Sequence, residues 1–86
     1  MGRKVTPMTI NLITKCVTGG AAKVTHIYEE TLISVVEDGT KRPATSGDVN
    51  KAIAWLVGQG YKPTAQPRFL GKAATIRERE YTFSKE

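Results

Sequence analysis

The first patterned segment of the chain alternates apolar and polar side chains, which is the period of a β-strand with one covered face. We expect this strand to run from Met8 to Val17, and its more apolar face carries Met8, Ile10, Leu12 and Cys16. Ile13 and Val17 interrupt the alternation, so both faces are expected to be partly covered. Residues 1–7 lack periodicity and are predicted to form a flexible end.

Two β-prone runs follow, residues 23–29 and 31–36, both rich in β-branched side chains. The pattern leaves open whether they are two strands that turn at Glu29-Glu30 or one long bent strand. Asp38-Gly39 favours a tight hairpin that leads into a short strand, residues 40–42. Pro43 is expected to end that strand, because proline cannot donate a ladder hydrogen bond.

A change to helical spacing predicts one α-helix. Its apolar stripe is formed by Val49, Ala52, Ile53 and Leu56, with Trp55 at the edge. Thr45 or Ser46 is expected to cap the helix, with Asp48 in the first turn, where the helix dipole favours negative charge. Gly58 or Gly60 is expected to end it in a left-handed conformation.

Two more β-prone runs follow the helix. Residues 61–70 contain Pro63 and Pro67, which predicts an edge strand or an irregular one. The last run, residues 74–84, alternates, and one of its faces carries Thr75, Arg77, Arg79, Tyr81 and Phe83. The whole pattern predicts an α+β fold: an antiparallel sheet of four to six strands with one helix packed on a face, in the order β-β-β-α-β-β. A chain of 86 residues has room for one domain, which we place at residues 8–86.

Cysteine and histidine usage narrows the function classes. Cys16 and His26 are the single residues of their types, so neither an intramolecular disulfide nor a Cys- and His-rich zinc site is expected. We therefore predict no catalytic residue, no metal and no cofactor, and we interpret Cys16 as a buried small apolar residue. The sequence has no apolar run of membrane-spanning length, so we expect no membrane contact and a cytoplasmic location.

The distribution of charge points to an acidic partner. The formal net charge is +5. Residues 1–39 hold four basic and four acidic side chains, whereas residues 40–86 hold nine basic and four acidic ones. An asymmetry of this kind favours binding to a polyanion.

Two groups of residues are candidates for that contact. Lys41 and Arg42 precede a helix start at which Ser46 and exposed backbone amides are suited to hold a phosphate. The second group lies on and before the last strand and combines cations with aromatic rings, a pairing suited to backbone contact and base stacking; it comprises Arg68, Lys72, Arg77, Arg79 and Tyr81. The competing interpretation makes Tyr81 and Phe83 core residues and pairs the arginines with carboxylates.

The sequence thus predicts a small non-enzymatic module whose basic sheet face engages an acidic partner, most simply nucleic acid. The alternative is an oligomeric inhibitor, of the kind carried by viruses or mobile elements, that binds a host protein or sequesters a small anionic ligand such as a nucleotide. A homo-oligomer is compatible with this alternative, because a chain of this size builds a small core and has exposed sheet edges.

Overall fold

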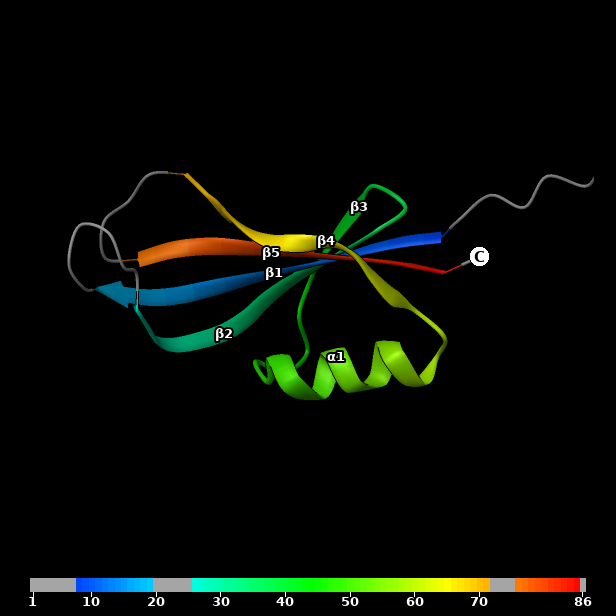
Figure 1. Cartoon of the computed structure of the whole chain (residues 1–86), viewed down its shortest axis with the longest axis horizontal. Coiled ribbons are helices and arrows are strands. Elements are labelled where there is room, and N and C mark those ends of the chain that lie inside the picture. The colour runs from blue at the N-terminus through cyan, green and yellow to red at the C-terminus, as the bar shows by residue number, and fades with distance from the viewer. Residues whose placement is uncertain (1–7, 20–25, 72–75, 86) are drawn as a thin grey trace, which may run out of the picture.

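A computed structural model describes residues 8–19, 26–71 and 76–85. They form β1 (Met8–Gly19), β2 (His26–Glu37), β3 (Thr40–Pro43), α1 (Val49–Gly58), β4 (Lys62–Leu70) and β5 (Ile76–Lys85). The five strands build one antiparallel sheet in the order β3-β2-β1-β5-β4, and α1 lies on one face of it (Figure 1). The predicted fold class and element order are confirmed. The predicted flexible end, residues 1–7, lies outside the described residues.

The second β-prone region is one long strand, so Glu29 and Glu30 lie within β2 and do not form a turn. Its register against β1 shifts twice, which leaves Ile33 and Tyr28 as extra residues in β2. Bulges of this kind bend and twist a strand. After the first shift, Glu30 faces Cys16 of the central strand.

The β2–β3 hairpin turns where the sequence predicts it. Asp38 and Gly39 both have positive φ, 50° and 78°, as a two-residue hairpin with matching twist requires. The short strand β3 ends at Pro43. The predicted edge strand is also confirmed, because β4 lies at the other edge of the sheet and its register against β5 shifts twice.

The N-terminal cap of α1 differs from the expectation. Asp48 is the N-cap residue, and its carboxylate accepts a hydrogen bond of 3.0 Å from the Lys51 amide. Ser46 accepts only from the Asp48 amide, at 3.3 Å. A carboxylate is the stronger acceptor and places its charge at the positive end of the helix dipole, which explains why it takes the position expected for Thr45 or Ser46.

The C-terminus of α1 follows the expectation. Gly60 adopts a φ of 94°, and the Tyr61 amide donates to the Leu56 carbonyl at 3.0 Å. This turn places the Tyr61 ring in the core, where it is buried. Among the described residues, no helix has the length and apolarity needed to cross a bilayer.

The apolar core lies between α1 and one face of the sheet, which we call the helix-side face. Sheet and helix contribute Ile10, Leu12, Leu32, Val49, Leu56, Tyr61 and Phe83 to it. In Figure 1, β1, β2 and β5 extend well beyond α1 at one end. The helix therefore covers one part of the helix-side face and leaves the other part, the distal half, to be covered in another way.

Candidate functional site

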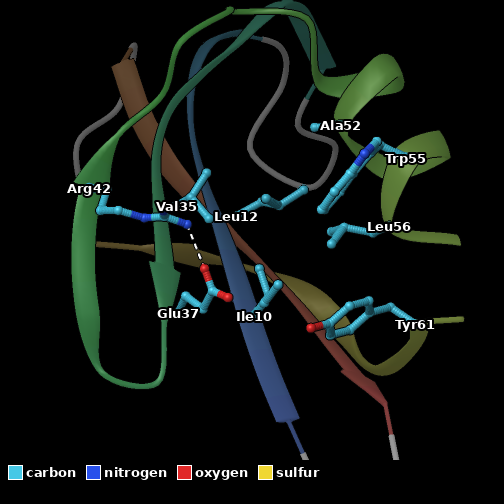
Figure 2. Close-up of a pocket in the computed structure, with 9 residues that line it drawn as sticks. All are labelled: Ile10, Leu12, Val35, Glu37, Arg42, Ala52, Trp55, Leu56 and Tyr61. Carbon is cyan, nitrogen blue, oxygen red and sulfur yellow. Dashed lines mark hydrogen bonds and ion pairs between the residues drawn. The ribbon is translucent and has the colours of Figure 1, made fainter. Parts of the chain in front are cut away.

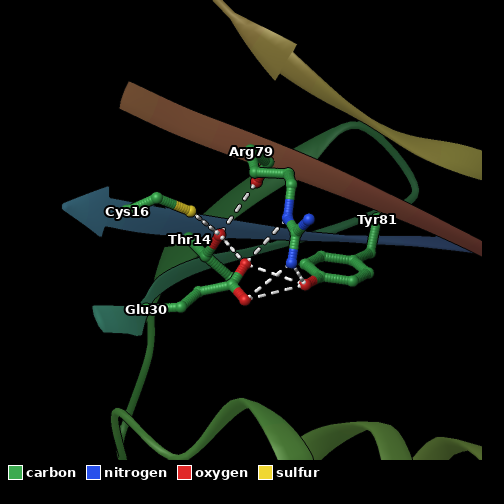
Figure 3. A network of polar contacts seen from close by, with 5 residues as sticks. All are labelled: Thr14, Cys16, Glu30, Arg79 and Tyr81. Atoms are coloured by element: carbon green, nitrogen blue, oxygen red, sulfur yellow. Dashed lines mark hydrogen bonds and ion pairs between the residues drawn. The ribbon is translucent and has the colours of Figure 1, made fainter. Parts of the chain in front are cut away.

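Side chains of the sheet itself cover the distal half. Arg79 and Tyr81 share the helix-side face of β5, as predicted, but both contact Glu30 of β2 (Figure 3). The Arg79 guanidinium binds the carboxylate through two nitrogens, with Nη2–Oε1 at 2.8 Å and Nε–Oε2 at 3.0 Å. The Arg79 and Glu30 side chains are only 22% and 16% exposed. For Arg79, the interpretation that pairs the arginines of this strand with carboxylates is therefore the correct one.

Further donors saturate the Glu30 carboxylate. The Tyr81 hydroxyl donates to it at 2.8 Å, and the Thr14 hydroxyl donates to Oε2 at 2.7 Å. Arg79 also donates to the Tyr81 hydroxyl. Thr14, which belongs to this network, and Cys16 on the same face of β1 are fully buried. Hydrogen bonds and an ion pair thus cover the distal half of the helix-side face, whereas α1 covers the other half.

The pKa shifts agree with a structural role for the network. Burial alone would raise the pKa of Glu30, but hydrogen bonds from Arg79, Thr14 and Tyr81 outweigh it and lower that pKa. Burial and the bond to Glu30 raise the pKa of Tyr81 to about 12. Burial also raises the pKa of the Cys16 thiol. Glu30 is held as an anion, Tyr81 as a neutral donor and Cys16 as a thiol, which is the weakly nucleophilic form.

Two further predicted cations are also paired. Arg68 lies opposite Glu80 on the other face of the sheet, with Nε–Oε1 at 3.0 Å. Arg42 pairs with Glu37 across the hairpin at 2.5 Å. Lys41 is the strand neighbour of Arg42, so the two side chains point to opposite faces and do not converge.

At the start of α1, the predicted anion site is already occupied by oxygen atoms of the chain itself. The Asp48 carboxylate and the Ser46 hydroxyl both accept from amides of this turn. An incoming phosphate would face the Asp48 charge there. The structure thus brings together Arg77, Arg79 and Tyr81, and it separates them from Lys41, Arg42, Ser46 and Arg68; Lys72 lies outside the described residues.

An apolar groove beside α1 is the feature that the sequence does not predict. It has a volume of about 250 Å³ and is lined by Ile10, Leu12, Val35, Glu37, Arg42, Ala52, Trp55, Leu56 and Tyr61. Figure 2 shows strand residues on one side, α1 and Tyr61 on the other, and the Glu37–Arg42 pair at the margin. The groove exists because β3 is short and α1 packs mainly through Val49 and Leu56, so the sheet beside it stays open.

Trp55 is the most exposed residue of this apolar lining. Its surface is 61% exposed, although it lies directly beside the buried Leu56. The position of Trp55 at the edge of the helix stripe is the one sequence feature that could have indicated the groove. Among the described residues, no group of three or more His, Cys, Asp or Glu side chains is placed to hold a metal ion. No known protein family, curated protein or solved structure matches this chain.

Proposed function

We propose that this protein is a non-enzymatic binding module that holds a segment of a partner protein in the groove beside α1. The observation that carries the proposal is the exposed Trp55 indole next to an apolar cavity. Tryptophan and arginine dominate the binding energy of protein interfaces, and they act in pockets that lose water when the partner binds. Trp55 and Arg42 lie on the same groove.

The size of the groove favours a side chain over a small molecule. Pockets for small-molecule ligands measure roughly 300–1,000 Å³. The groove, at about 250 Å³, lies below that range and is open to solvent, so it suits one apolar side chain of a partner better than a whole small molecule. A partner would therefore present a single apolar anchor.

The Glu37–Arg42 pair supplies a polar contact at the groove margin. The two side chains are 44% and 59% exposed, and an exposed ion pair contributes only about 0–1 kcal/mol. Arg42 is thus free to exchange Glu37 for a carboxylate of the partner at little energetic cost. An acidic residue near the apolar anchor is the sequence feature expected in the partner.

A peptide-display selection tests this proposal. Selected peptides are expected to share one large apolar residue with an acidic neighbour. The variants Trp55→Ala and Ala52→Leu, which remove one wall or fill the groove, should weaken binding at least about tenfold, or ~1.4 kcal/mol.

Val57→Ala is the matched control, because Val57 is an exposed apolar residue of α1 that does not line the groove. Binding by this variant should equal that of the parent protein, and circular dichroism should show that every variant is folded. The proposal fails if no peptide is enriched over scrambled sequences, or if enriched peptides bind the Ala52→Leu variant as well as the parent.

A further inference from the structure

Arg77 differs from the other arginines of the described residues. Arg42, Arg68 and Arg79 each pair with a carboxylate. Arg77 forms no ion pair within the described ranges, and its Nε is buried without a hydrogen-bond partner. The residue as a whole is neither fully buried nor fully exposed. Among residues 8–19, 26–71 and 76–85, no carboxylate pairs with this positive charge.

An aromatic ring holds this guanidinium in place. The Arg77 guanidinium carbon lies 4.9 Å from the centre of the Phe69 ring, and that of Arg79 lies 5.8 Å from the same ring. Phe69 comes from β4, which pairs with β5 so that Phe69 faces Arg79. A guanidinium stacked on a ring has already lost much of its freedom, so binding a ligand costs less conformational entropy.

The carboxylates nearby are oriented away or already paired. Glu78 and Glu80 flank Arg79 along β5 and therefore point to the opposite face. Glu30 accepts hydrogen bonds from Arg79, Tyr81 and Thr14. In the described part of the chain, no carboxylate therefore offsets the positive charge of Arg77, which lies opposite Cys16 in the distal half, away from α1.

We propose that Arg77 binds a phosphate group at the distal half. The planar guanidinium fork matches two phosphate oxygens, and its contact with the Phe69 ring restricts its movement. The net charge of +5 draws a polyanion to the molecule. The phosphate belongs either to a nucleic-acid backbone or to a free nucleotide, which share this chemistry. The site is independent of the groove beside α1.

Fluorescence anisotropy with a labelled single-stranded oligonucleotide tests this site. The parent protein should bind at low salt, and affinity should fall as salt rises because counterions are released. Arg77→Gln should lower affinity about tenfold and reduce the salt slope by about one. Arg77→Lys keeps the charge but loses the fork and should lie between the two.

Arg68→Gln is the matched control, because Arg68 lies on the other face and is already paired with Glu80. This variant should bind the oligonucleotide like the parent. Trp55→Ala should also bind the oligonucleotide like the parent, because a loss of peptide binding in that variant concerns only the groove beside α1. Displacement of the oligonucleotide by equimolar adenosine monophosphate assigns the phosphate to a free nucleotide, and resistance to displacement assigns it to the backbone. Absence of binding at low salt to the oligonucleotide and to the nucleotide, or equal losses in Arg68→Gln and Arg77→Gln, would overturn the proposal.

Discussion

Glu30 is the residue on which the distal half depends. Its carboxylate collects hydrogen bonds from three side chains of β1 and β5. Sequence reasoning finds two neighbouring glutamates among β-prone runs and leaves open whether the chain turns there. The bulges of β2 instead place Glu30 opposite Cys16, within reach of Arg79. A bulge has no reliable sequence signature, so this ion pair was not predictable from strand alternation.

Replacement of this carboxylate should be costly. Glu30→Gln leaves the guanidinium of Arg79, 22% exposed, without its counter-charge. Removing one partner of a fully buried pair costs ~3–5 kcal/mol, so we expect a loss of about 2–3 kcal/mol for this partly buried one. Urea denaturation at neutral pH measures it.

A matched control and a pH series accompany this measurement. Glu80→Gln removes a carboxylate whose partner, Arg68, is 71% exposed, and should cost under about 1 kcal/mol. Because the pKa of Glu30 is lowered by folding, its contribution is present above the unfolded-state pKa and is lost as pH falls through the folded-state value. The parent protein should therefore lose stability on acidification more steeply than Glu30→Gln. Equal losses in both glutamine variants would contradict a special role for Glu30.

At the scale of elements, the N-terminal end of α1 is fixed by close contact with β2. The Leu32 amide donates to the Gly47 carbonyl at 2.9 Å, which holds β2 against the segment that precedes α1. A Cβ added at Gly47 would lie 2.7 Å from Cγ2 of Thr31. Gly47 thus permits an approach that a larger residue would prevent.

Gly47→Ala should accordingly destabilise the fold by about 1–3 kcal/mol through overpacking. Thr31→Ser removes the clashing methyl group, after which the nearest remaining atom is 3.9 Å away, so the double variant should recover most of the loss. Gly58→Ala is the control: its Cβ meets nothing within 4 Å, and alanine in a helix should add about 0.5–1 kcal/mol. Thermal denaturation of the four variants compares them, and a double variant no more stable than Gly47→Ala would refute the steric explanation.

Elements were more predictable than their contacts. Strand alternation, the Asp38-Gly39 turn and the helical stripe each depend on local sequence, and the structure has all of them. The predicted helix cap was wrong because Thr45, Ser46 and Asp48 all fit the local pattern, and Asp48, with the stronger acceptor, takes the position. The groove was not predicted because it depends on where α1 lies across the sheet, which local pattern does not determine.

At the scale of the whole molecule, two kinds of interaction cover one face of one sheet. The apolar core beneath α1 covers one part, and the Glu30 network covers the distal half. The molecule is elongated, with extents of 55 × 27 × 21 Å. Its parts are nevertheless joined, because β1, β2 and β5 run continuously through both (Figure 1). Ile10 and Leu12 of the core and Thr14 and Cys16 of the distal half all belong to β1.

This continuity predicts a single cooperative unfolding transition. Trp55 on α1 reports on the core through its fluorescence, and circular dichroism reports on the whole sheet. The two signals should give coincident urea transitions. Glu30→Gln changes no residue of α1 or of the apolar core, yet it should lower the Trp55 midpoint by as much as the circular-dichroism midpoint, because loss of the distal half exposes the shared strands.

If the Trp55 transition kept its midpoint in Glu30→Gln while the circular-dichroism transition shifted or split, the region beneath α1 would fold on its own. The strands would then connect two independent units, and a ligand at Arg77 could not stabilise the groove beside α1. In a cooperative molecule, by contrast, phosphate bound at Arg77 raises the Trp55 midpoint.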